Sequence, residues 1–119
     1  MIKRGEIHYA KLDEGIGSEQ EGCRPVLVVQ NNIGNLYSHT IIVIPITSAF
    51  KNNMPTHVKL GRNYGLFLES TALAEQILTI DRSRFGDYIG TIDDNKMKEV
   101  DRALKISLGI NYNLTEEGK

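Results

Sequence analysis

The stretches VLVVQ (residues 26–30) and TIIVIPI (residues 40–46) contain the longest apolar runs of the chain and decide its fold. Each is rich in β-branched residues and is flanked by Gly, Asn or Ser, a pattern that predicts core strands of ordinary length. Both runs fall far short of the length that a bilayer-spanning helix needs. The two stretches therefore predict a protein built around a β core.

Shorter strand patterns surround these two segments. Many short strands separated by Gly-rich turns are typical of a small barrel or of two packed sheets, rather than of a doubly wound fold. The further strands are expected at Glu6–Leu12, His57–Leu60, Ser70–Ala74, Gln76–Ile80 and Tyr88–Ile92, with turns at 61–63 and at Gly86-Asp87.

One long helical pattern follows the strands. Its N-cap is Asp93 or Asp94, and Gly109 ends it. Apolar residues at spacings of three and four predict a single buried stripe, mostly within the protein's own core, at Met97, Val100, Leu104 and Leu108.

The composition predicts a single domain. The chain has 119 residues, 40% hydrophobic and 24% charged, which is enough for one hydrophobic core. We expect one domain over residues 1–110 and a polar tail over 111–119. The lone Cys23 excludes an internal disulfide and a multi-cysteine metal site. No signal-type segment follows Met1, so a cytoplasmic location is expected.

Acidic residues are unevenly distributed. The net charge is −1, but residues 22–68 contain no Asp or Glu, where the average of 15 acids in 119 residues would put about six. The basic residues there, Arg24, Lys51, Lys59 and Arg62, give this stretch a charge of +4. One face could therefore attract an anion while the whole chain stays near neutral. Chance, combined with a buried β core, is the alternative explanation.

The segment Asp13–Cys23 (DEGIGSEQEGC) predicts a long polar loop, and such loops often carry function. The next residue, Arg24, precedes Pro25, which biases Arg24 toward an extended backbone and so gives its guanidinium a defined position. Thr47 follows the strand at residues 40–46 and precedes a polar segment. An arginine and a hydroxyl are the groups that hold a phosphate.

Motifs of the common enzyme classes are absent from the sequence: there is no P-loop, dinucleotide fingerprint, His-Glu-x-x-His or nucleophile elbow. RNA cleavage does not require a metal when the 2'-hydroxyl of the RNA is the nucleophile, and Arg24 and Thr47 are of the right type for it. Two of His8, His39 and His57 could instead supply acid–base catalysis. A solvated surface arginine and a strand-end threonine remain the structural alternatives.

Several motifs occur in one order along the chain. They include RGEI at residues 4–7, GSEQEGCRPVLVVQN at 17–31, ITS at 46–48, PTHV at 55–58, EQILTID at 75–81 and ALKISLG at 103–109. In this order they resemble the MazF/PemK-like toxins of bacterial toxin–antitoxin pairs. The resemblance extends over nearly the whole chain up to Gly109.

This resemblance implies an SH3-like β-barrel of the CcdB/MazF type with a C-terminal helix, in a homodimer. It also implies an mRNA interferase: a sequence-specific, metal-independent endoribonuclease that needs no cofactor, cleaves single-stranded RNA and leaves 2',3'-cyclic phosphate and 5'-hydroxyl ends. A cognate antitoxin with an acidic, disordered tail would inhibit it. The family's catalytic pair corresponds to Arg24 and Thr47. Its RNA-groove positions correspond to Ser18, Glu19, Gln20, Asn31, Pro55, Thr56, Ser70, Glu75 and Gln76, whose donors and acceptors suit unstacked bases.

The chain departs from the family pattern at several positions. Leu78 stands where a basic residue is usual, and the loop at 51–55 is shorter and less basic. Glu21 and Cys23 replace residues that are commonly glycine and an aliphatic. None of these touches the implied catalytic pair, but each could alter RNA affinity or the recognised sequence. The alternatives are a CcdB-like protein that poisons gyrase without catalysis, and an inactive barrel that only binds RNA or protein.

Overall fold

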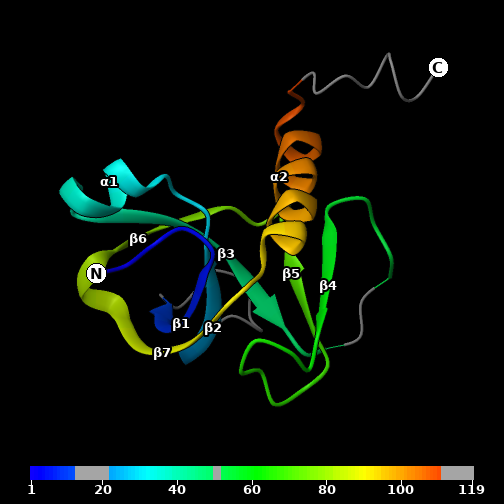
Figure 1. The fold of residues 1–119 in the computed structure, drawn as a ribbon, viewed down its shortest axis with the longest axis horizontal. Helices are drawn as coiled ribbons and strands as arrows, with labels where there is room; N and C mark the ends of the chain where they lie inside the picture. Colours follow the sequence, from blue (N-terminus) through cyan, green and yellow to red (C-terminus); the bar gives the residue numbers. More distant parts are fainter. Residues whose placement is uncertain (13–21, 50–51, 111–119) are drawn as a thin grey trace.

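A computed structural model describes residues 1–12, 22–49 and 52–110 as a curled antiparallel sheet with a C-terminal helix (Figure 1). The elements in chain order are β1 (Glu6–Leu12), β2 (Gly22–Val28), α1 (Asn32–Tyr37), β3 (Thr40–Thr47), β4 (His57–Gly61), β5 (Ser70–Leu73), β6 (Leu78–Asp81), the 3-10 helix η2 (Arg82–Arg84), β7 (Phe85–Thr91) and α2 (Asp94–Leu108).

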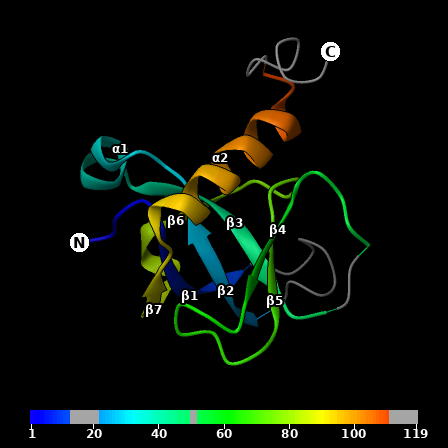
Figure 2. The same cartoon turned by 45° about the vertical axis from the view of Figure 1, so that its right-hand side comes forward.

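The sheet has the strand order β4-β5-β3-β2-β1-β7, and β6 pairs with β3 as well. The strand β3 thus has two partners on one side: its first half pairs with β6, and its end pairs with β5, where Thr47 lies opposite Thr71. This division bends the sheet into a half-open barrel, visible from two sides in Figures 1 and 2. The predicted fold class, a mainly β SH3-like barrel with a C-terminal helix, is confirmed.

Residues 26–28 of β2 and 43–46 of β3 are buried on both faces, which explains why these segments are apolar without interruption. On β2, Val26 and Val28 pack into one hydrophobic cluster together with Ile41. The residue between them, Leu27, packs into a second cluster, which also holds Val100 of α2. Side chains alternate between the faces of a strand, so each face of β2 contributes to a core.

The helix α2 has the predicted caps. The Asp93 carboxylate accepts a hydrogen bond from the backbone N–H of Lys96 at 2.7 Å, and Gly109 closes the helix at φ 72°. Of the predicted apolar stripe, Val100 is buried and Met97 and Leu104 pack partly buried against the core, whereas Leu108 is 60% exposed. The end of α2 extends beyond the sheet, so no strand covers Leu108 (Figure 1). No helix in the described ranges combines the length and apolar character of a membrane span.

The second strand starts earlier than predicted and stops earlier. Gly22 and Cys23 belong to β2 rather than to a loop, while Gln30 lies outside it. The backbone N–H groups of Val29 and Gln30 both donate to the carbonyl of Ile42, which ends the regular ladder. The Gln30 side chain then continues the pairing, because its amide donates to the Thr40 carbonyl and accepts from the Ile42 N–H.

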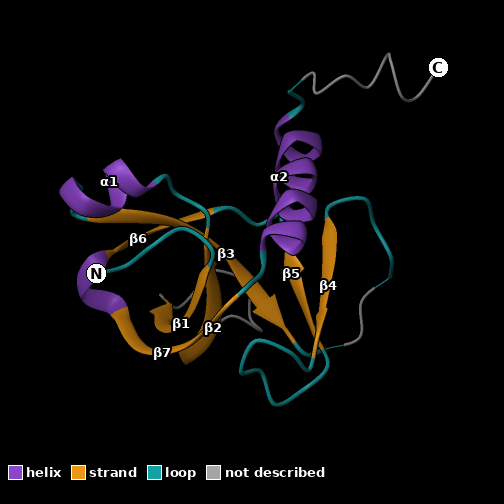
Figure 3. Cartoon of the chain, in the orientation of Figure 1, coloured by secondary structure: helices purple, strands orange, loops and turns teal. Residues whose placement is uncertain are grey.

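The predicted turn at Gly86-Asp87 is wrong, because both residues lie inside β7. Phe85 pairs with Ala10 and Tyr88 with His8, so β7 has one residue more than β1 over this interval. The extra residue makes a β-bulge, which Gly and Asp suit as well as they suit a turn. The short helix α1 was not predicted, since its six residues are too few to show a helical period. Figure 3 shows both helices against the strands.

Candidate functional site

A cleft of about 420 Å³ opens where the start of β2 and the end of β3 meet the connection between β4 and β5. Tyr9 comes from β1, Arg24 from β2 and Thr47 from β3, and Phe67 comes from the β4–β5 connection; all four line the cleft. Three strands and a connection therefore form the cleft that holds the arginine and the threonine predicted from the sequence.

The register of the sheet explains why Arg24 and Thr47 meet. In the ladder between β2 and β3, Val26 lies opposite Pro45 and Leu27 opposite Ile44. Continued by two residues, this register sets Arg24 opposite Thr47. Directly opposed residues of antiparallel strands point to the same face, with Cβ atoms about 5 Å apart. Arg24 is also paired with Ala10 of β1, so its backbone is held from the other side too.

The Thr47 hydroxyl is oriented by the backbone. The N–H of Ala49 donates to Thr47 Oγ1 at 3.1 Å, and the residue itself is half-buried. A hydroxyl has two lone pairs and one proton, so this bond uses one lone pair and keeps the proton for donation. Pairing with Thr71 fixes the Thr47 backbone. The arrangement presents a cation and a fixed hydroxyl donor on one face, a combination that suits a phosphate.

A second, polar cleft of about 580 Å³ adjoins the first. The two clefts share Ser48, Ala49 and Ser70, and the second adds Asn52, Asn53, Lys59, Glu69 and Thr71. Ser70, a predicted RNA contact, therefore lies between them. Its Oγ donates to the Leu68 carbonyl at 2.6 Å, which leaves the oxygen lone pairs for a ligand.

Thr56 and Glu75, two predicted RNA contacts, lie together with His57 at the other end of the β4–β5 pair. This end is about 13 Å along the strands from Ser70. Thr56 Oγ1 donates to one carboxylate oxygen of Glu75 at 2.9 Å, and His57 Nε2 contacts the other at 2.9 Å. Burial raises the pKa of Glu75, but hydrogen bonds from its own backbone, Thr56 and His57 outweigh burial, so the pKa lies below its ordinary value. This cluster, which we call the Glu75 cluster, holds an ionised carboxylate.

The remaining predicted RNA contacts lie outside the two clefts or outside the described residues. Pro55 is exposed beside Thr56, and the Gln76 N–H donates to the Leu73 carbonyl at the turn after β5. Asn31 caps α1, because its side chain accepts from the Gly34 N–H at 2.7 Å. The three residues Ser18, Glu19 and Gln20 fall among the residues that the structure does not describe.

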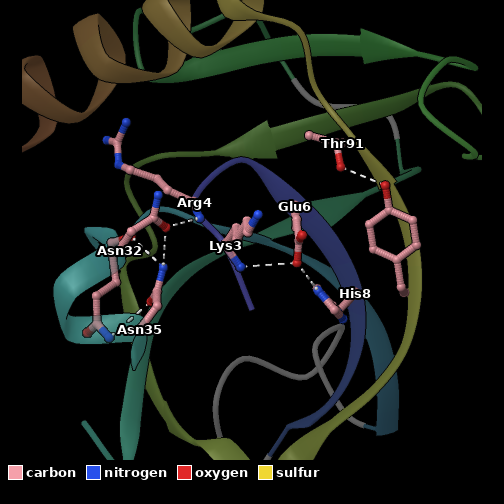
Figure 4. A network of polar contacts seen from close by, with 9 residues as sticks. Lys3, Arg4, Glu6, His8, Asn32, Asn35 and Thr91 are labelled. Atoms are coloured by element: carbon pink, nitrogen blue, oxygen red, sulfur yellow. Dashed lines mark hydrogen bonds and ion pairs between the residues drawn. The ribbon is translucent and has the colours of Figure 1, made fainter. Parts of the chain in front are cut away.

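A polar network fixes the segment around α1. Asn32 Oδ1 accepts from the Arg4 N–H at 2.7 Å, and Asn35, fully buried, donates to Asn32 Oδ1 at 3.1 Å (Figure 4). Nearby, His8 Nε2 contacts Glu6 Oε1 at 2.8 Å. None of the three histidines lines either of these two clefts.

Sequence reasoning missed several residues of the first cleft, among them Tyr9, Phe67 and Leu68. Tyr9 belongs to a strand that was predicted correctly, and its alternation with buried Ala10 could have shown that it faces outward. Phe67 and Leu68 lie in a connection without periodicity, so only the structure places them at the cleft. Within residues 1–12, 22–49 and 52–110, no three His, Cys, Asp or Glu side chains are grouped as metal ligands would be.

Comparison with known proteins gives consistent matches. Residues 3–108 match the model of the PemK-like, MazF-like toxins of type II toxin–antitoxin systems. Endoribonuclease EndoA of Bacillus subtilis (strain 168) is 48% identical over 112 residues, which cover 92% of this chain and 97% of that protein.

Two solved structures share the fold over most of their length. A mycobacterial endoribonuclease in complex with its cognate antitoxin is 26% identical, with a TM-score of 0.77 over 92% of this chain and 97% of that one. MazF from Deinococcus radiodurans is 27% identical, with a TM-score of 0.77 over 91% and 96%. The chain therefore belongs to the family of PemK-like, MazF-like toxins of type II toxin–antitoxin systems.

Proposed function

We propose that this toxin is an endoribonuclease that cleaves single-stranded RNA at specific sequences without a metal, with Arg24 and Thr47 as its catalytic pair. The observation that carries the proposal is the meeting of these two residues in one cleft, and the register of β2 against β3, extended by two residues, sets them opposite each other. The 48% identity to an endoribonuclease supports the activity. Such an enzyme acts on mRNA in the cytoplasm.

In the proposed reaction, the 2'-hydroxyl of the RNA attacks the adjacent phosphorus and the bond to the 5'-oxygen of the next nucleotide breaks. The products are a 2',3'-cyclic phosphate and a 5'-hydroxyl, so no water is consumed. Arg24 binds the non-bridging oxygens and stabilises the charge that grows on them. The Thr47 O–H donates to the same phosphate. Both groups sit on paired strands, which keeps them in place before the substrate arrives.

The predicted RNA contacts divide between phosphate and bases in this proposal. Ser70 extends the phosphate site toward the polar cleft, where Lys59 offers a positive charge to the phosphate beside the negative charge of Glu69. The Glu75 carboxylate would repel phosphate but can accept from the exocyclic amino group of an adenine or a cytosine. With Pro55, Thr56 and Gln76 beside it, the Glu75 cluster would read a base further along the strand. Asn31, Ser18, Glu19 and Gln20 complete the proposed groove.

A cognate antitoxin is the proposed regulator. The mycobacterial relative was solved with its own antitoxin. In this chain the acid-free stretch at residues 22–68, with its charge of +4, includes Arg24 and Lys59 of the two clefts. An acidic antitoxin segment would neutralise these charges and exclude RNA from the clefts.

We expect the free toxin to be a homodimer. Exposed apolar side chains remain at the end of α2, where Leu108 is 60% and Ile110 50% exposed, and a second copy could cover them. Light scattering at micromolar concentration should give twice the mass of 13.3 kDa. A purely monomeric species would contradict the dimer without touching the chemistry.

The activity is tested by incubating the purified protein with a long mRNA in EDTA and mapping the ends. We expect discrete cuts whose downstream fragments need a kinase before ligation and whose upstream fragments resist ligation until the cyclic phosphate is removed. A substrate with a 2'-deoxynucleotide at a mapped cut should stay intact there. Intact RNA with the wild-type protein would exclude the activity and favour a CcdB-like or purely binding role.

A further inference from the structure

Two large apolar side chains are exposed at the edge of the catalytic cleft. Phe67 is 83% and Leu68 62% exposed, and both line the cleft that holds Arg24 and Thr47. The residue before them, Leu66, is only 8% exposed and packs into the core. Leu66 therefore anchors the β4–β5 connection, and the next two side chains are left facing solvent.

Hydrogen bonds fix the backbone on which these side chains stand. The Arg62 guanidinium donates through Nε to the Phe67 carbonyl at 3.2 Å, and Ser70 Oγ donates to the Leu68 carbonyl at 2.6 Å. The backbone N–H of Leu66 donates to the Asn63 carbonyl at 3.0 Å. Both exposed residues are thus tied through their own carbonyls.

Close packing against β7 also fixes the connection between β4 and β5. A Cβ added at Gly65 would lie 2.3 Å from the Ile89 carbonyl oxygen, and one added at Gly90 would lie 1.9 Å from the Tyr64 carbonyl oxygen. Only glycine at both positions allows the two backbones to come this near. The connection lies at the end of the sheet away from the free end of α2 (Figures 1 and 2). Binding a ligand therefore costs little conformational entropy in this connection, because its backbone is already fixed.

In the cleft, this rigidly held apolar surface lies beside Arg24, the proposed phosphate-binding group. Arg24 provides the charge, while Phe67, Leu68 and the 39% exposed Tyr9 provide aromatic and aliphatic surface. A nucleotide of single-stranded RNA has the same two parts, an anionic phosphate and a flat base with a free π-face. Aromatic side chains beside a cationic groove are how proteins hold unstacked bases.

We propose that Phe67, flanked by Leu68, is a stacking platform for one unpaired base next to the scissile phosphate. This inference rests on the proposed ribonuclease function and adds a residue that sets affinity and register for the substrate. Stacking does not depend on base identity, so Phe67 holds the strand while other groups choose the sequence.

The test measures binding of an uncleavable RNA, with a 2'-deoxynucleotide at the mapped cut and 2-aminopurine at each flanking position in turn. Wild type should quench 2-aminopurine at one position. Phe67→Ala should lose that quenching and bind about 10-fold more weakly, while Phe67→Trp should retain both. Tyr37→Ala is the matched control, because Tyr37 is an aromatic residue with 78% exposure on α1, outside both clefts.

A second substrate distinguishes the role of Phe67 from a general loss of structure. RNA lacking the base at the quenched position should bind wild type and Phe67→Ala equally, since no stack remains to be lost. Thermal unfolding checks that each variant is folded. If Phe67→Ala binds RNA as tightly as wild type and quenches 2-aminopurine in the same way at every position, the platform is overturned. The exposed side chains of Phe67 and Leu68 would then be expected to contact a protein partner.

The two proposals fail in different ways. Cleavage by wild type together with an unchanged Phe67→Ala overturns the platform alone. Intact RNA, combined with weaker binding of Phe67→Ala to a random-sequence pool of short RNA oligonucleotides, overturns the nuclease function but keeps Phe67 as a stacking platform for an unpaired base. A wild-type protein that binds no single-stranded RNA overturns the platform outright.

Discussion

The two ends of the β4–β5 pair carry polar groups of opposite character. At the end near Ser70, the first cleft presents Arg24 and the Thr47 O–H, a cation and a donor. At the other end, the Glu75 cluster holds an ionised carboxylate between Thr56 and His57. A phosphate is attracted by the first end and repelled by the second.

The difference suggests how one strand of RNA could be held in a defined direction. Donors and a positive charge recognise the backbone, which is the same in every nucleotide, whereas an acceptor recognises the amino groups of particular bases. Removing a group at the cleft should therefore affect turnover of every substrate. Removing Glu75 should affect binding, and only for some sequences.

The largest effect is expected for Arg24→Ala. Loss of the group that stabilises the phosphate's charge should lower kcat about 1,000-fold on any cleavable RNA. Because Arg24 is exposed, the unfolding midpoint should change by less than about 3 °C. Single-turnover cleavage and thermal unfolding measure the two. Arg24→Lys keeps the charge without the planar fork and should recover little of the rate; full recovery would reduce the role of Arg24 to charge alone.

A smaller effect on turnover is expected for Thr47→Val. The variant keeps the shape of the side chain but removes the hydroxyl, so kcat should fall about 10- to 100-fold with little change in KM. Thr47→Ser keeps the hydroxyl and should stay within about threefold of wild type. If Thr47→Val cleaves as fast as Thr47→Ser, the hydroxyl has no part in catalysis and serves only to accept the Ala49 N–H.

Local sequence signals predicted the parts of this fold that depend on neighbours along the chain. The caps at Asp93 and Gly109 and the apolar runs of β2 and β3 are such signals. The meeting of Arg24 and Thr47 also follows from sequence, once those two strands are paired. The family resemblance assigned Ser70 and Glu75 to the same RNA groove. It did not indicate that these two residues lie at opposite ends of the β4–β5 pair.

Features set by contacts between distant segments were not predictable. The approach of Gly65 to Ile89 joins two segments that neither sequence pattern connects, and it is this contact that positions Phe67. The bulge at Gly86-Asp87 is visible only in the register with β1. Likewise, the bond between Thr56 and Glu75 depends on the pairing of β4 with β5. Pattern shows which residues form strands, but not which strands become neighbours.

The variant Glu75→Gln tests the role of the Glu75 cluster, at the end of the β4–β5 pair away from the cleft. The amide keeps the shape but replaces one acceptor with a donor, so KM should rise about fivefold for RNA whose base donates an amino group at the contacted position. The value of kcat should change by less than about twofold, because the proposed chemistry occurs at the other end, at Arg24 and Thr47. Substrates changed one base at a time locate the position. A fall in kcat equal to that of Thr47→Val would erase the division between the two ends.

The smallest effect is a dependence of stability on acid. Because the pKa of Glu75 lies below its ordinary value of 4.5 in the folded protein, its contribution is present above that pH and is lost as the pH falls through the folded pKa. Wild type should thus exceed Glu75→Gln by about 1 kcal/mol or less at pH 7, as measured by urea unfolding, and the difference should vanish in stronger acid. Thr56→Val removes one of the bonds that lower the pKa but leaves the carboxylate, so its acid-dependent contribution should be smaller and lost over a narrower range. If the difference in free energy of unfolding between wild type and Glu75→Gln stays constant from neutral pH into acid, Glu75 stabilises the fold by packing. Its charge, which distinguishes this end from the cleft, then contributes nothing to folding.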